Sequence, residues 1–176
     1  LGTKVISGIV DIEEQPHLRR GLASSAFDNE GVATKPRMLV ERGILQGYLL
    51  SSYSARKLGM QTTGNAGGNH NLLVRHAQGQ QHQLGFEQML KEMGTGLLVT
   101  ELLGHGLNMV TGDYSRGAAG FWVENGVIAY PVEEITIAGN MKEMLTGIVA
   151  LGNDVLVQGS RQVGSILIER MTVAGE

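Results

Sequence analysis

Two short segments of the chain carry apolar residues on both sides of a turn that favours glycine. Residues 38–50 and residues 121–130 are apolar runs interrupted by Arg42-Gly43 and Asn125-Gly126. Pairs of this kind suit the tight turns that join antiparallel strands, because glycine accepts positive φ without strain. Each segment is therefore predicted to form a β-hairpin. Pro131 is expected to limit the second strand of the later hairpin, since proline cannot donate a ladder hydrogen bond.

Two other segments have apolar residues at helical spacing. In residues 86–93 they recur at i, i+3, i+4 and i+7, which predicts a helix that Gly94 can end. Residues 141–148 repeat the pattern after Asn140, a good N-cap, with Glu143 at the spacing of a capping box. A shorter helical turn is expected over residues 53–59. These helices are predicted to cover a sheet.

The remaining apolar runs predict further strands, at residues 72–75, 97–101, 155–158 and 165–173. The fold class is therefore predicted as α+β, a predominantly antiparallel β-sheet or barrel-like domain with a few short covering helices. At this length, residues 1–176 are expected to form a single domain. The chain starts with Leu1 and a strand-like segment, so we expect an upstream domain outside this sequence.

Composition and charge narrow the functional classes. Glycine accounts for 26 of 176 residues and has no fixed period, which indicates many turns. The net charge is −3 and the basic residues are scattered, so no nucleic-acid partner is expected. The chain has no cysteine and no apolar run near the roughly 20 residues that span a bilayer, so no membrane partner and a cytoplasmic location are expected.

Three histidines, His70, His76 and His82, are spaced six residues apart. This spacing could place them on one face of a strand, but it matches no common metal motif. A solvated polar loop is the favoured interpretation, with metal ligation as the alternative. The glycine-rich run from Gly64 to Gly68 lacks the ending of a phosphate-binding loop, so a close approach to another backbone is favoured there.

A second group of polar residues surrounds residues 105–116. His105 lies between two glycines, where its imidazole could be exposed to a substrate. Asp113, Ser115 and Arg116 could suggest nucleophilic chemistry, which also needs a base held within hydrogen-bonding reach. Only His105 is near in sequence, so a polar loop in which Asp113 bonds to nearby backbone groups is favoured.

Several ordered motifs resemble the C-terminal part of the TldD/PmbA family, which is also called the modulator of DNA gyrase family. The resemblance covers nearly the whole chain and is closer to the PmbA (TldE) branch than to the TldD branch. It rests on Asp28-Asn-Glu-Gly-Val32, Ser52-Tyr-Ser-Ala-Arg-Lys-Leu-Gly59, Thr63-Gly-Asn-Ala-Gly-Gly68, Gly112-Asp-Tyr-Ser-Arg-Gly-Ala-Ala-Gly-Phe-Trp-Val-Glu-Asn-Gly126, Thr136-Ile-Ala-Gly-Asn140 and Gly152-Asn-Asp154.

The resemblance implies a peptidase system in which a TldD-like subunit and a PmbA-like subunit form a heterodimer that trims unfolded peptides. In TldD the zinc ligands come from an upstream His-Glu-x-x-x-His helix and from a cysteine near the C-terminus. The matching neighbourhood here, residues 159–164, has no cysteine. No metal, cofactor or catalytic residue is therefore expected in this chain, and zinc is expected on the TldD-like partner.

This chain is then expected to supply a wall and an edge for an unfolded peptide substrate, which could bind by adding a strand to a sheet. The candidate groove-lining residues are His105, in a turn between glycines, and Asp113, Tyr114 and Arg116, in a loop expected over residues 112–120. Arg116 could meet a carboxylate. The alternatives are an active metalloprotease in its own right and a non-enzymatic regulator of gyrase. In isolation the chain could form a homodimer.

Overall fold

The computed structural model describes residues 1–175, which form two compact units, each assembled from separate parts of the chain. The first unit comprises residues 1–4, 8–82 and 154–164. The second comprises residues 5–7, 83–153 and the described part of 165–176. The single domain expected for the chain stays a prediction.

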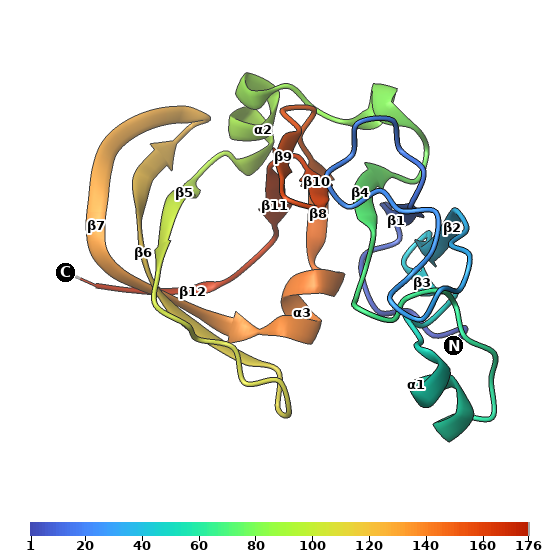
Figure 1. Cartoon of the computed structure of the whole chain (residues 1–176). Helices are drawn as coiled ribbons and strands as arrows, with labels where there is room; N and C mark the ends of the chain where they lie inside the picture. Colours follow the sequence, from blue (N-terminus) through green and yellow to red (C-terminus); the bar gives the residue numbers. More distant parts are fainter. Residues whose placement is uncertain (176) are drawn as a thin grey trace. The chain divides into compact units, whose positions relative to one another are not determined.

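The first unit is built on a six-stranded sheet (Figure 1). Neighbouring strands of this sheet are antiparallel, except β4 and β10, which are parallel. In spatial order the strands are β3 (Ile44–Leu45), β2 (Arg37–Glu41), β1 (Val10–Gln15), β4 (Asn71–His76), β10 (Arg161–Val163) and β9 (Leu156–Gln158).

Local sequence explains the turns and helices of the first unit. Arg42 and Gly43 both take positive φ, 47° and 78°, as the predicted hairpin between β2 and β3 requires. Helix α1 (Ser52–Lys57) begins at Ser51, whose hydroxyl caps the first turn. The unit also contains a 3-10 turn, η1 (Gln80–His82). The hairpin and the short helix are both confirmed.

The second unit contains a curved four-stranded antiparallel sheet and a separate strand pair (Figure 1). The sheet does not close into a barrel, and the α+β class is confirmed. The strands of the sheet, in spatial order, are β12 (Thr172–Ala174), β7 (Val127–Asn140), β6 (Asp113–Glu124) and β5 (Gly96–Leu103). The pair consists of β11 (Ile166–Ile168) and β8 (Ile148–Leu151).

Two expectations about the long hairpin are wrong. Strand β7 continues through Pro131, because β12 pairs only with residues 136–138 and leaves the proline at an open edge of β7. Residues 113–120, expected as a loop, are part of β6. Gly120 permits this pairing, since a Cβ at its position would lie 1.9 Å from the carbonyl oxygen of Leu98 on β5.

Helix α2 (Phe86–Met93) ends at Gly94, whose φ of 66° confirms the predicted stop. Helix α3 (Met141–Thr146) begins at Asn140, which accepts a hydrogen bond of 3.1 Å from the Lys142 amide. The helix is two residues shorter than the apolar spacing predicts, because Ile148 begins β8. Within residues 1–175, none of the helices has the length and apolar character that crossing a membrane requires.

The core of the second unit lies on one face of the curved sheet. Ala118, Ile135 and Ile137 are buried there, and in the ladder between β6 and β7 Ala118 lies opposite Ile135. The partly buried side chains that pack against them are Leu97, Val99, Tyr114, Val132 and Met171. Several of these core residues also line a cavity of the second unit.

Candidate functional site: a buried carboxylate network and an apolar cavity

A buried carboxylate lies in the middle of the sheet of the first unit. Glu14 on β1 is 1 % exposed, and three groups donate hydrogen bonds to its two oxygens. They are Nε of Arg37 at 2.9 Å, Nδ2 of Asn65 at 2.8 Å and the amide of His70 at 2.8 Å. The charge is therefore both paired and fully hydrogen-bonded, which burial of a carboxylate requires.

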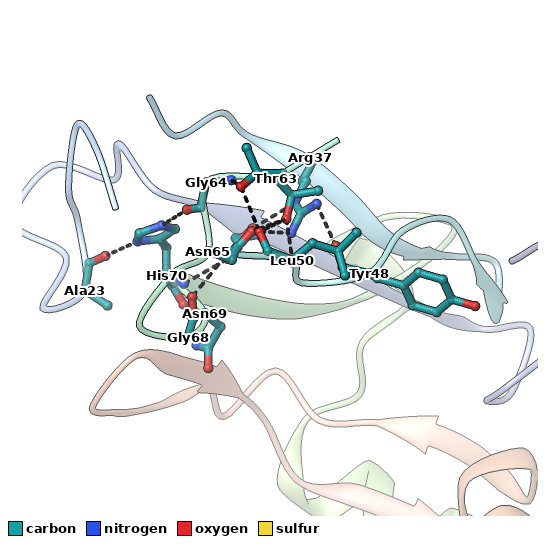
Figure 2. Close-up of polar contacts among 12 residues, drawn as sticks. Ala23, Arg37, Tyr48, Leu50, Thr63, Gly64, Asn65, Gly68, Asn69 and His70 are labelled. Atoms are coloured by element: carbon teal, nitrogen blue, oxygen red, sulfur yellow. Dashed lines mark hydrogen bonds and ion pairs between the residues drawn. The ribbon is translucent and has the colours of Figure 1, made fainter. Parts of the chain in front are cut away.

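Arg37 extends this network to two further segments (Figure 2). Its Nη1 donates to the carbonyl oxygen of Tyr48 at 2.9 Å, and its Nη2 donates to Oδ1 of Asn65 at 2.6 Å. The hydroxyl of Thr63 donates to the same Oδ1 at 2.8 Å. Strands β1 and β2 are thus tied to residues 48–70, which contain little regular structure of their own.

His70 does not lie in the solvated polar loop that the sequence favoured. His70 is buried, and its ring nitrogens lie 3.2 Å from the carbonyl oxygen of Ala23 and 3.0 Å from that of Gly64 (Figure 2). A solvated loop is therefore wrong for His70. The close backbone approach expected of the glycine-rich run is confirmed, because a Cβ on Gly64 would lie 3.0 Å from the carbonyl oxygen of Ala33.

His76 on β4 and His82 on η1 stack with ring centroids 5.2 Å apart. Burial lowers the pKa of His76 below its ordinary value, and the charge of His82 lowers it further, against a smaller opposing effect of Asp11. The pair therefore favours the neutral form of His76.

Asp28 organises the loop that precedes β2. Its carboxylate accepts hydrogen bonds of 2.9 Å from the amides of Glu30, Val32 and Ala66. Desolvation raises the pKa of Asp28, but these three backbone bonds, with the nearby His70, together bring it below the ordinary value. Asp28 is therefore held in the charged form as the acceptor of this loop.

The described residues do not fit a zinc ion. Both oxygens of Glu14 and both ring nitrogens of His70 are engaged with protein groups. The stacked pair of His76 and His82 supplies only two donors, and residues 1–175 contain no group of three or more potential metal ligands. No catalytic step is therefore assigned to a metal on this chain.

The second unit contains an apolar cavity of about 680 Å³. This volume lies within the roughly 300–1,000 Å³ typical of ligand cavities. The cavity is lined by the core face of the curved sheet, by α2, α3 and the pair β8–β11, and by residues 169–173. Its lining side chains include Leu98, Leu102, Tyr114, Trp122, Ile137 and Val149.

Strand β5 forms one edge of the curved sheet and also lines this cavity. It pairs with β6 on one side, and in the described part of the chain no strand pairs with its other side. An unpaired edge presents alternating amide and carbonyl groups that another extended chain can bond. The edge carries mostly apolar residues, with Glu101 its one charged side chain.

The four residues expected to line a groove are all near the β5–β6 connection, but only Tyr114 lines the cavity. The carboxylate of Asp113 accepts hydrogen bonds from the Thr111 hydroxyl at 2.7 Å and from the side-chain Nδ2 of Asn140 at 3.4 Å. These bonds organise the polar turn. His105 is exposed in that turn. Arg116 is partly buried on β6, and its Nη2 donates to the carbonyl oxygen of Leu102 at 3.3 Å.

Sequence reasoning did not find the Glu14 network. A signal was present, because Val10, Ile12 and Glu14 alternate along β1 and so face the same side of the sheet. A glutamate at the inward position of such a strand indicates a buried, partnered charge. Its partners could not be read from the sequence, since Arg37, Asn65 and His70 are distant along the chain.

Comparisons with known proteins agree with this fold. A family model described as the PmbA/TldA metallopeptidase C-terminal domain matches residues 1–175. Metalloprotease PmbA of Escherichia coli O157:H7 is 57% identical over 176 residues, covering 100% of this chain and 38% of that protein. A PmbA homologue of Haemophilus influenzae is 53% identical, covering 99% of this chain and 38% of its own length.

Two solved structures have the same fold. A candidate modulator of a DNA gyrase from Thermotoga maritima MSB8 has a TM-score of 0.88 and 40% identity, covering 99% of this chain and 41% of that one. TldE from Thermococcus kodakarensis has a TM-score of 0.85 and 25% identity, covering 99% and 42%. The chain thus spans about two fifths of the length of these relatives. On the family match and the identity to the PmbA proteins, this chain belongs to the PmbA/TldD metallopeptidase family.

Proposed function

We propose that this chain is the peptide-holding C-terminal part of a PmbA-like subunit, which works with a TldD-like, zinc-carrying subunit to trim unfolded peptides in the cytoplasm. The observation that carries the proposal is the unpaired edge of β5 beside the apolar cavity. An extended peptide can bond to such an edge through its main chain while its apolar side chains enter the cavity.

The composition of the cavity supports a substrate class rather than one sequence. Its walls are mostly apolar, with Leu98, Trp122 and Val149 from three different strands. Main-chain bonding to β5 would depend little on the identity of the peptide side chains. Burial of apolar side chains contributes roughly 25 cal/mol per Å². Unfolded segments with exposed apolar residues are therefore the favoured ligands.

The potential metal ligands of this chain support different roles for the two subunits. The candidate ligands Glu14 and His70 are occupied by structural hydrogen bonds, and the chain has no cysteine. A zinc ion on the TldD-like subunit would supply the activated water for hydrolysis. This chain would bind the peptide, hold it extended and exclude water from its apolar side chains.

A cleavage assay on the full-length protein that contains this chain tests the proposal. The lone protein is expected to contain no stoichiometric zinc and to leave an unfolded peptide intact. Adding a TldD-like subunit is expected to give cleavage that a chelator abolishes. Chelator-sensitive cleavage together with stoichiometric zinc in the lone protein would contradict the proposal and favour an independent metalloprotease. A pair that cleaves no unfolded peptide would instead favour a regulatory binding protein.

A further inference from the structure

Arg116 combines partial burial with an incomplete set of partners. Its Nε is a buried donor with no hydrogen-bond partner in the structure. Within residues 1–175 its guanidinium makes one hydrogen bond, from Nη2 to the Leu102 carbonyl oxygen, and at 3.3 Å this bond is beyond the usual range of about 2.7–3.2 Å. In the described part of the chain, no carboxylate forms an ion pair with it. Neither the charge nor the hydrogen-bond donors of the guanidinium are therefore fully partnered within the described residues.

The position of Arg116 explains how Nε comes to be buried. A Cβ on Gly106 would lie 2.7 Å from Cγ of Arg116 and 1.6 Å from the carbonyl oxygen of Ser115. The glycine thus lets the β5–β6 connection press against the stem of the arginine. A buried donor without a partner is unfavourable, because the hydrogen bond that it makes to water in the unfolded chain is lost and not replaced.

Arg116 does not line the cavity itself, but it lies next to residues that do. Its ladder partner is Ile137, so the two side chains share a face of the sheet, and Ile137 lines the cavity. Tyr114, two residues earlier on the same face, lines it as well, as does Leu102, whose carbonyl oxygen accepts from Nη2. The hydrogen bond to Leu102 thus places Nη2 beside a residue of the cavity wall.

We propose that Arg116 binds a carboxylate of the peptide held in this cavity and so gives the site a preference for acidic or C-terminal peptide segments. Nε and Nη2 form one side of the planar guanidinium, and a carboxylate can accept from both at once. The inference rests on the proposed peptide-binding function and adds a substrate preference to it. The carboxylate can come from the peptide C-terminus or from an aspartate or glutamate side chain.

Binding of three matched peptides to this chain, measured by calorimetry, tests the proposal. The neutral peptide is acetyl-Ser-Leu-Val-Leu-Thr-amide. The second peptide has the same sequence with a free C-terminal carboxylate, and the third replaces the final threonine with glutamate and keeps the amide. We expect at least one of the two charged peptides to bind about tenfold more tightly than the neutral one, because hydrogen bonds to charged groups are stronger than neutral ones.

Substitutions of Arg116 then assign the effect. Arg116→Gln is expected to remove the difference in affinity between the charged and neutral peptides, and Arg116→Lys to keep only part of it, because lysine lacks the planar fork of donors. Arg161→Gln is the matched control, since it removes the same charge from an exposed position on β10 of the first unit.

The outcomes separate this inference from the proposed function. Equal affinity of wild-type protein for all three peptides would overturn the role of Arg116 and leave peptide binding intact. No binding of any peptide would overturn both. A preference that survives in Arg116→Gln would also refute the inference. The wild-type comparison needs no variant, so the test holds even if a substitution impairs folding.

Discussion

Replacing Glu14 with glutamine is expected to lower the free energy of unfolding by about 3–5 kcal/mol, the usual cost of breaking a buried ion pair. The substitution leaves the guanidinium of Arg37 without its carboxylate at 2.9 Å. The glutamine amide has one acceptor oxygen, so it cannot accept both from Arg37 at one position and from Asn65 and the His70 amide at the other. Urea denaturation followed by circular dichroism measures the loss.

The neighbouring residue provides the matched control. Glu13 pairs with Arg75 at 3.1 Å, but the side chain of Arg75 is 44% exposed. Exposed pairs of this kind contribute about 1 kcal/mol or less, so Glu13→Gln should change stability little. Similar losses for the two variants would contradict the account of the Glu14 network. They would indicate that burial and partner number do not distinguish these adjacent carboxylates.

Replacing Val149 with tryptophan is expected to weaken binding of the neutral peptide at least tenfold. Val149 on β8 lines the cavity and is 46% exposed, so a larger side chain can be accommodated without disturbing the core. The indole would occupy apolar space that the peptide side chains need, and loss of one or two buried aliphatic groups accounts for a change of this size. Calorimetric titration gives the affinity.

Val157→Trp is the control for this substitution. Val157 lies on β9 of the first unit, is 57% exposed and does not line the cavity. It introduces the same side chain on a different surface, so peptide affinity should remain at the wild-type value. Equal weakening by both variants would indicate a nonspecific effect of the tryptophan. Unchanged binding in Val149→Trp would place the peptide outside the cavity.

The elements that sequence alone predicts here are those set by neighbouring residues. The hairpin turn at Asn125-Gly126 takes φ of 53° and 76°, and Gly94 ends α2, because both depend on local backbone preferences. Strand β1 was missed because its apolar positions alternate with acidic ones over only six residues. The path of β6 was missed because the fit of Gly120 against Leu98 involves a distant segment.

The candidate site likewise combines residues that the sequence indicates with residues that only the fold brings together. Tyr114 and Arg116 could be named from the sequence as polar residues near a hairpin, and the structure places one in the cavity and the other beside it. The remaining walls come from α2, β8 and β11, which only the tertiary fold brings to the face of β5. The unmet hydrogen bond of Arg116 likewise depends on atoms that no sequence pattern locates.

Amide hydrogen exchange along β5, with and without the neutral peptide, tests the central claim most directly. If the peptide adds to the unpaired edge, the outward-facing amides among residues 96–103 should exchange more slowly when it is bound. Outward amides alternate along a strand, so protection at every second residue is predicted. Exchange in β5 that is the same with saturating bound peptide and without peptide would contradict the claim.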